Sequence, residues 1–206
     1  MHAPWLAGNT APSPVQLPVR SFACPYRASI VLRNLQTPWR SDRIRFWSPM
    51  PAGHAKPRIV LGADHAGFHL KETVKKLLRD SGYDCEDVGT YSEESVDYPD
   101  FARGVAERVA SGQCDLGILA CGTGIGMAIA ANKVPGVRAA TAHDPMTARL
   151  AREHNDANVL ALGGRILDDA GATEVVREFL AAQFAGGRHQ RRIDKILELD
   201  RDRARL

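Results

Sequence analysis

The chain has 206 residues, of which 44% are hydrophobic, and a formal net charge of +3. This length fits one globular domain with an appendage, and no apolar run approaches the ~20 residues that are needed to span a bilayer. Residues 1–57 hold seven Lys or Arg and a single acid, so the rest of the chain is mildly acidic and is not typical of a nucleic-acid-binding domain.

Residues 1–57 also contain nine of the twelve prolines and all three tryptophans. Because proline at this density blocks regular structure, we expect this extension to be largely disordered. Its excess of arginine fits a transit peptide, although the prolines argue against the amphipathic helix that such a peptide forms, and it lacks the apolar stretch of a secretory signal. We favour a dispensable extension or a true translation start at Met50.

From Arg58 onward, short apolar runs alternate with segments of helical periodicity. Apolar runs bounded by turn residues predict buried strands, and apolar residues at three- and four-residue spacing predict helices. The expected strands are 58–63, 83–89, 115–121, 137–142 and 158–163. The expected helices are 68–82, 97–112, 124–133, 145–155, 168–185 and 191–206.

This alternation indicates right-handed crossovers and a five-stranded parallel sheet in a three-layer αβα sandwich, Rossmann-like or flavodoxin-like. We expect the strand order 2-1-3-4-5 or one close to it. Ligands then bind between the first and third strands, beyond their carboxyl ends. Asp64, His65 and Cys121 follow these strands, so topology brings them toward one crevice. The last helix is amphipathic, and its apolar face needs a partner surface.

The stretch LACGTGIGMAIAAN, residues 119–132, joins the third strand to a helix. A dinucleotide fingerprint needs its glycines after the first strand, and Met127 stands where its last glycine should be; a P-loop lysine is also missing. The glycines fit a tight packing turn, in which they permit positive φ and close approach. They equally fit a loop that exposes amide groups to an anion or an enolate-like oxyanion.

The four cysteines, Cys24, Cys85, Cys114 and Cys121, form no CxxC pair and no zinc-type spacing with histidine, which indicates a reducing cytoplasm. Cys121 directly precedes the glycine loop, where the positive end of a helix favours the thiolate. A thiolate beside an oxyanion site suits acyl transfer or proton abstraction next to a carbonyl, and the hydroxyl of Thr123 can donate or accept there. The alternative for Cys121 is a small buried residue.

Histidines and a carboxylate provide further candidates. Asp64 and His65 lie at the tip of the first strand, although Asp64 can instead cap the following helix. His143 ends the fourth strand at the ligand-binding edge, and His154 ends the next helix, whose C-terminus favours a protonated ring. On spacing alone these two histidines rank equally, and a surface or capping role is the alternative for either.

Arg188, Arg191 and Arg192 lie at the head of the last predicted helix, behind two glycines. Basic residues oppose the helix dipole there, and a bound phosphate would relieve this through charge-assisted hydrogen bonds. The alternative is a solvated basic turn. Arg165, after the fifth strand, is a second, isolated candidate.

Five ordered motifs resemble the type B ribose-5-phosphate isomerases, a family that also includes the allose- and galactose-6-phosphate isomerases. The motifs are GADHAGFHLK, VDYPDFA, ILACGTGIGMAIAANK, REHNDANVLALGGR and GGRHQRRI. The resemblance covers about residues 58–200 and leaves 1–57 unmatched. It implies a sugar-phosphate isomerase domain over 58–206 with a C-terminal dimerisation helix, in a homodimer that shares its active sites and is sometimes paired into a tetramer.

The resemblance also implies interconversion of ribose 5-phosphate and ribulose 5-phosphate through ring opening and a cis-enediolate, without metal or organic cofactor. The base falls on Cys121, because Met127 replaces the glutamate that serves another branch. Ring opening falls on His154 with help from Asp64, and Thr123 relays protons. The residues that contact substrate fall on Asp64, His65, Tyr98, Gly122, Thr123, Gly124, Ile125, Gly126, Asn155, Arg165, Arg188 and Arg192.

Two other functions stay open. An isomerase of a six-carbon aldose phosphate, such as allose 6-phosphate, differs in pocket size, which the sequence does not reveal. A non-catalytic sugar-phosphate-binding protein would be favoured by loss of Cys121, His154 or the glycine loop, and all are present. The basic residues of 1–57 are spread out, which argues against binding of nucleic acid or membrane. We therefore expect a cytoplasmic enzyme of the pentose phosphate pathway.

Overall fold

The computed structural model describes residues 56–203. The strands are β1 (Ile59–Ala63), β2 (Cys85–Asp87), β3 (Leu116–Cys121), β4 (Ala139–Thr141) and β5 (Val159–Gly163). The helices are α1 (Phe68–Asp80), α2 (Tyr98–Ala110), α3 (Ile125–Ala131), α4 (Pro145–Asn155), α5 (Asp169–Ala181), the short 3-10 helix η2 (Gly187–His189) and α6 (Gln190–Arg203). Residues 1–55 lie outside the described residues, and with them the predicted disorder of the extension and the start at Met50. No described helix is long and apolar enough to cross a bilayer.

The five strands form one parallel sheet in the order β2-β1-β3-β5-β4. The predicted αβα sandwich is confirmed, but the predicted order 2-1-3-4-5 is wrong for the last two strands. Burial explains the exchange: every residue of β5 is buried, whereas the residues of β4 are half-buried and suit an edge. The switch point still lies between β1 and β3.

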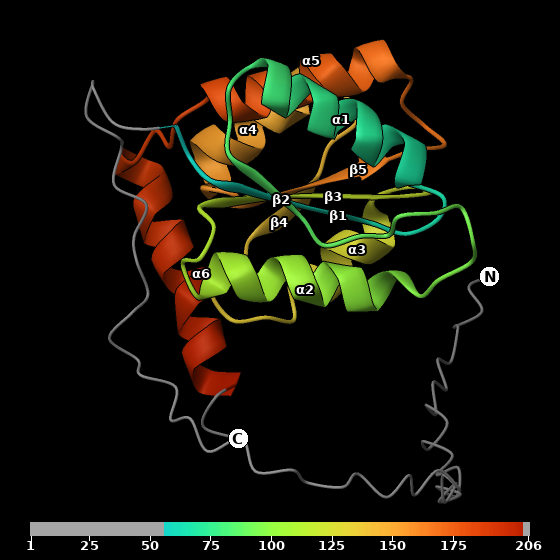
Figure 1. Cartoon of the computed structure of the whole chain (residues 1–206). Coiled ribbons are helices and arrows are strands. Elements are labelled where there is room, and N and C mark those ends of the chain that lie inside the picture. The colour runs from blue at the N-terminus through green and yellow to red at the C-terminus, as the bar shows by residue number, and fades with distance from the viewer. Residues whose placement is uncertain (1–55, 204–206) are drawn as a thin grey trace, which may run out of the picture. The chain divides into compact units, whose positions relative to one another are not determined.

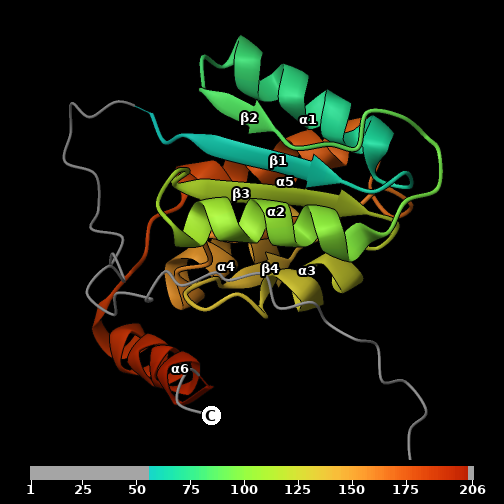
Figure 2. The ribbon, with the colours of Figure 1, turned by 60° about the horizontal axis from the view of Figure 1, so that its bottom comes forward.

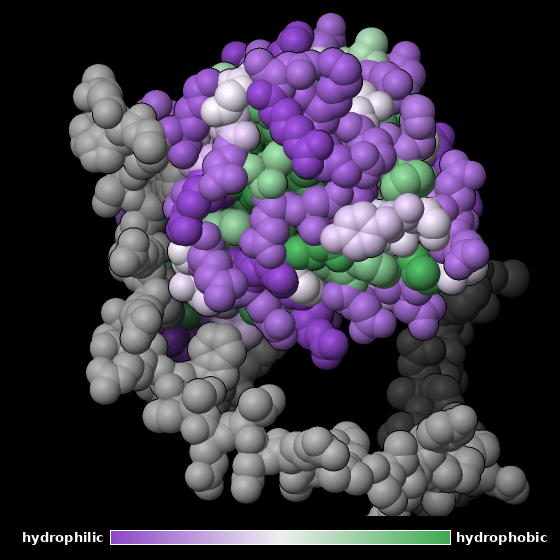
Figure 3. Space-filling model, in the orientation of Figure 1, coloured by the Kyte–Doolittle hydropathy of each residue, from purple (hydrophilic) through white to green (hydrophobic). Residues whose placement is uncertain are grey.

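Helices cover both faces of this sheet. Helices α1, α4 and α5 pack on one face, and α2 and α3 pack on the other (Figure 1). Successive strand residues alternate between the layers, so that Ile59 and Leu61 join the first and Val60 joins the second. Strands that are buried on both faces need near-continuous apolar runs, which is what the sequence contains. Figure 3 shows mainly hydrophilic residues over the β2 side of the molecule, as suits an edge that faces solvent.

The C-terminal helix α6 lies at the end of the sheet where the strands begin (Figure 2). The predicted helix 168–185 ends early, at Ala181, and the chain then leads into η2. Gly186 and Gly187 both have positive φ, 61° and 54°, so these glycines turn the chain toward α6 instead of only ending α5. Arg188 and Arg192 are thereby carried to the side of the sheet where the strands start.

A buried lysine, Lys71, ties α1 to the segment that follows β2. Its side chain is 1% exposed, and its Nζ lies 2.8 Å from both carboxylate oxygens of Asp87 and 2.8 Å from the carbonyl oxygen of Thr90. Burial alone would raise the pKa of Asp87, but hydrogen bonds from Lys71 and Lys75 outweigh it and hold that pKa below its ordinary value. The cluster fixes the start of the segment that leads to α2.

We expect Lys71→Met to lower the free energy of unfolding by about 3 kcal/mol at pH 7, because it removes one partner of a buried ion pair. Urea denaturation measures this change. The matched control is Lys76→Met on the same helix, whose side chain is 78% exposed and pairs with Asp80; it should cost less than about 1 kcal/mol.

The Lys71–Asp87 pair also makes the free energy of unfolding depend on pH. Since the folded pKa of Asp87 is lowered, its contribution is complete above the unfolded pKa of about 3.9 and is lost as the pH falls through the folded value. The stability difference between wild type and Lys71→Met should therefore shrink as the pH falls from about 4 to about 2. A difference that stays constant over this range would contradict the role of the Asp87 charge.

Candidate active site

The loops that follow β1, β3 and β5 meet backbone to backbone. A Cβ on Gly67 would lie 2.3 Å from the carbonyl carbon and oxygen of Ala120, and one on Gly164 would lie 2.6 Å from the carbonyl oxygen of Ala66. The Gly164 N–H also donates to the carbonyl of Cys121 at 2.7 Å. These contacts leave no room for side chains between the loops, so the groups that they carry converge at one edge of the sheet.

The glycine loop both packs tightly and donates hydrogen bonds, so the two interpretations of its glycines are compatible. Cys121 is 5% exposed and ends β3 within the α2–α3 layer of the core. The N–H of Gly124, which has a φ of 77°, donates to Cys121 Sγ at 3.1 Å. An amide directed at sulfur stabilises negative charge there, as a thiolate base needs. Met127 is fully buried in the same layer.

Asp64 and His65 follow β1 at the same edge of the sheet as this loop, and Tyr98 lies against the loop itself. One carboxylate oxygen of buried Asp64 accepts the N–H of Gly67 at 2.9 Å, so Asp64 closes the turn before α1. His65 Nδ1 accepts the N–H of Val96 at 3.3 Å, so the neutral ring carries its proton on Nε2 and can donate from there. The ring of Tyr98, the first residue of α2, lies against the first turn of α3.

Glycines make room for two neighbouring side chains. A Cβ on Gly126 would lie 2.9 Å from Cζ of Tyr98, and one on Gly122 would lie 3.4 Å from Cδ and Nε of Arg165. The Arg165 N–H donates to the carbonyl of Gly122 at 3.0 Å. Tyr98 and Arg165 thus flank the glycine loop from two sides. His143 reaches the same loop, with Nε2 2.9 Å from the carbonyl oxygen of Thr123.

A second group of predicted residues lies at the opposite edge of the sheet. Helix α4 begins after β4 and runs back to the start of β5, so His154 and Asn155 at its end lie where the strands begin. Eleven residues of helix span about 16 Å. Within one chain, the structure therefore does not bring His154, Asn155, Arg188 or Arg192 together with Cys121.

The residues at this far edge contact one another. The rings of His154 and His189 stack, with centroids 4.3 Å apart and an interplanar angle of 9°. Burial, and then the positive charges of His154, Arg188 and Arg192, lower the pKa of His189. The Ala185 N–H donates to the carbonyl of Glu153 at 2.9 Å, which joins the end of α4 to the segment before η2.

Sequence reasoning missed the buried ion pairs that hold the end of α4. Asp156 follows Asn155 with a φ of 44°. Its carboxylate lies 2.7 Å from Arg138 Nη2 and 3.3 Å from Arg152 Nη1. Periodicity gives no sign of these pairs; the only local signal is the Asn-Asp dipeptide after a helix, which favours a left-handed residue. The ion pairs hold the residue that directly follows His154 and Asn155 at the end of α4.

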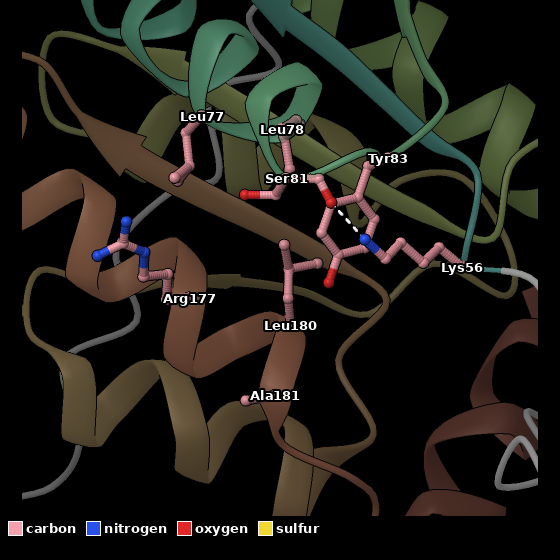
Figure 4. A pocket seen from close by; sticks show the side chains of 8 residues that line it. All are labelled: Lys56, Leu77, Leu78, Ser81, Tyr83, Arg177, Leu180 and Ala181. Carbon is pink, nitrogen blue, oxygen red and sulfur yellow. Dashed lines mark hydrogen bonds between the residues drawn. The ribbon is translucent and has the colours of Figure 1, made fainter. Parts of the chain in front are cut away.

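A pocket of about 220 Å³ lies elsewhere, between the C-terminal ends of α1 and α5 (Figure 4). Its apolar floor is flanked by Tyr83 and Arg177, and Lys56 Nζ donates to the Ser81 carbonyl across it. None of the residues predicted for the site lines this pocket. Asp64, Cys121 and Arg165 instead lie at the carboxyl ends of β1, β3 and β5, where open α/β proteins bind small ligands.

The fold and the position of these residues are those of an open α/β protein that binds a small ligand. Comparison with known proteins identifies its family. Residues 59–196 match the model of the ribose/galactose isomerases. Ribose-5-phosphate isomerase B of Escherichia coli is 46% identical over 146 residues, which cover 71% of this chain and 98% of that protein. The chain therefore belongs to the ribose/galactose isomerase family.

Solved structures agree with this assignment. The structure of Clostridium thermocellum ribose-5-phosphate isomerase B matches with a TM-score of 0.70 and 51% identity, and the match covers 70% of this chain and 98% of that one. Ribose-5-phosphate isomerase B from Mycoplasma genitalium, solved with bound ribulose-5-phosphate, matches with a TM-score of 0.69 and 45% identity, over 72% of this chain and 99% of that one.

Two glycine substitutions test the packing of the loops. Gly67→Ala should lower the free energy of unfolding by about 2 kcal/mol or more, because the new Cβ meets the rigid backbone of Ala120. Gly122→Ala should cost less than about 1 kcal/mol, because its Cβ would meet only the Arg165 side chain, at 3.4 Å. Urea denaturation measures both, and equal costs would contradict the close approach.

Proposed function

We propose that this protein interconverts ribose 5-phosphate and ribulose 5-phosphate, a step of the pentose phosphate pathway, through ring opening and a cis-enediolate. The observation that carries the proposal is the hydrogen bond from Gly124 N–H to Cys121 Sγ, at the edge of the sheet where Asp64 and His65 follow β1. The names of its relatives support the same substrate. The free thiols at Cys85, Cys114 and Cys121 fit a reducing, cytoplasmic compartment.

In the proposed reaction, His154 with help from Asp64 moves the protons that open the furanose ring. The Cys121 thiolate takes the proton from C2, and negative charge develops on the enediolate oxygen beside the loop amides. Thr123 relays a proton between O1 and O2, and Cys121 returns its proton to C1. Each step is general acid–base catalysis, which typically raises the rate about 10²–10⁴-fold. No step requires a metal or an organic cofactor.

The remaining groups bind the substrate. We assign His65, Tyr98, Asn155 and the loop from Gly122 through Thr123, Gly124 and Ile125 to Gly126 to contacts with the sugar, and Arg165, Arg188 and Arg192 to the phosphate. Guanidinium groups suit phosphate because they form paired, charge-assisted hydrogen bonds. Binding energy at the phosphate, which does not react, positions the carbons that do.

We also propose that a complete site needs two copies of the chain. Cys121 lies where the strands end, which we call the Cys121 edge, and His154 lies where the strands begin, which we call the His154 edge. A second copy must therefore bring its His154 edge to the Cys121 edge of the first. Exposed apolar side chains around the Cys121 edge support this contact, since such patches mark interfaces. They are Ile125, Ile129, Met146 and Ile166. A homodimer with two shared sites follows, and pairing of dimers would give a tetramer.

The assignment of the base is tested with Cys121→Ser. The variant should keep the fold, because serine is nearly isosteric, and should lose at least about 10²-fold in kcat for ribose 5-phosphate. Cys114→Ser, another buried cysteine of the same core layer, is the control and should keep its turnover. A Cys121→Ser enzyme with near-wild-type turnover would overturn the assignment. Turnover of allose 6-phosphate, measured alongside, tests the substrate: a preference for it would contradict the five-carbon proposal.

Shared sites are tested by mixing inactive variants. Cys121→Ala and His154→Gln should each be inactive, and refolding them together should restore about one quarter of wild-type activity, because half of the dimers are mixed and each of those has one intact site. The control mixes Cys121→Ala with Asp64→Asn. Both changes lie at the same edge, so no intact site forms and activity should stay low. Equal results from the two mixtures would contradict the shared site.

A further inference from the structure

His143 is a histidine at the Cys121 edge to which the proposed mechanism gives no role. It follows β4, its ring is half-buried, and its Nε2 lies 2.9 Å from the carbonyl oxygen of Thr123. A carbonyl oxygen only accepts hydrogen bonds, so this ring must carry a proton on Nε2. The hydroxyl of Thr141, the last residue of β4, lies 3.5 Å from the carbonyl oxygen of Gly124, the next carbonyl of the loop.

A single peptide group forms hydrogen bonds with both His143 and Cys121. The Thr123 carbonyl and the Gly124 N–H belong to the same planar trans peptide, so they point in opposite directions. The carbonyl accepts from His143, and the N–H donates to Cys121 Sγ at 3.1 Å. A ring that holds the carbonyl on one side therefore aims the amide at the sulfur on the other.

This peptide needs to be held. Gly124 has a φ of 77°, and glycine adopts positive and negative φ with similar ease, so the Thr123–Gly124 peptide can rotate unless something restrains it. Gly163 at the end of β5 leaves space for the restraint. A Cβ there would lie 3.0 Å from both His143 Nε2 and the carbonyl carbon of Thr123.

We propose that His143 is a positioning residue, which holds the Thr123–Gly124 peptide with its N–H on the Cys121 sulfur. The thiolate depends on this amide, so His143 controls the reactivity of Cys121 without touching the substrate. The consequence for catalysis rests on the proposed function of Cys121 as the base. The effect on the thiol itself does not.

The test compares His143→Leu with His143→Gln. Leucine fills similar space and cannot donate, whereas the terminal amide of glutamine can donate from near the Nε2 position. The readout is the rate at which iodoacetamide alkylates Cys121 at pH 7, followed by mass spectrometry of its peptide, with the Cys85 and Cys114 peptides as internal controls. We expect His143→Leu to slow alkylation of Cys121 about five-fold or more, and His143→Gln to restore most of the rate.

Steady-state kinetics provide the second readout. His143→Leu should lower kcat for ribose 5-phosphate about ten-fold and change KM by a smaller factor, because the ring itself does not touch the substrate. His143→Gln should again recover. An unchanged alkylation rate in His143→Leu, or no recovery in His143→Gln, would overturn the proposal. If alkylation responds as expected but Cys121→Ser retains turnover, the positioning role stands and the assignment of the base fails.

A further variant covers the case in which His143→Leu does not fold. Gly163→Ala adds a Cβ that would lie 3.0 Å from both His143 Nε2 and the Thr123 carbonyl carbon and 2.9 Å from Ile166 Cγ1, so His143 and the Thr123 backbone must shift while the imidazole stays in the protein. It should slow alkylation of Cys121 in the same way. Wild-type alkylation in a folded Gly163→Ala protein would overturn the proposal.

Discussion

In a parallel sheet, each crossover helix must carry the chain back from the end of one strand to the start of the next. Residues at the end of a strand and residues at the end of the following helix therefore lie at opposite edges. In this chain Cys121 ends a strand, and His154 ends a helix. That separation determines which candidate groups one chain can bring together.

The Cys121 edge is built from backbone contacts more than from side chains. Gly67 and Gly164 let the loops approach one another closely, and Gly126 and Gly122 make room for Tyr98 and Arg165 beside the glycine loop. The amide of Gly124 can then face the sulfur. The His154 edge is held differently, by stacked imidazoles and by the buried Arg138–Asp156 pair. Each of the two edges is thus held by its own set of contacts.

Much of the fold was predictable, because apolar periodicity reports burial directly. The strands, the crossover helices and the parallel sheet follow from it, and so does the meeting of Asp64, His65 and Cys121 at one edge. The exchange of β4 and β5 was not predictable from connectivity, since both orders obey right-handed crossovers; the weaker burial of β4 decides it. The burial of Lys71 was not predicted, because in a helical pattern any lysine counts as a polar, exposed position.

The sequence supplied candidates for the site but not their geometry. The resemblance to type B isomerases indicated Cys121 as the base and His154 as the ring-opening histidine. Spacing alone could not decide between His154 and His143. The structure separates them by location: His143 reaches the glycine loop, and His154 stacks on His189 at the other edge. The direction of a single peptide plane, on which the bond from Gly124 to sulfur depends, leaves no trace in the sequence.

The most direct test of the central claim is the specific activity toward ribose 5-phosphate over a dilution series, with the molecular mass measured at each concentration. Because the proposed site takes Cys121 from one chain and His154 from another, activity per chain should fall in step with the fraction of dimer. A monomer that retains full specific activity would contradict the account.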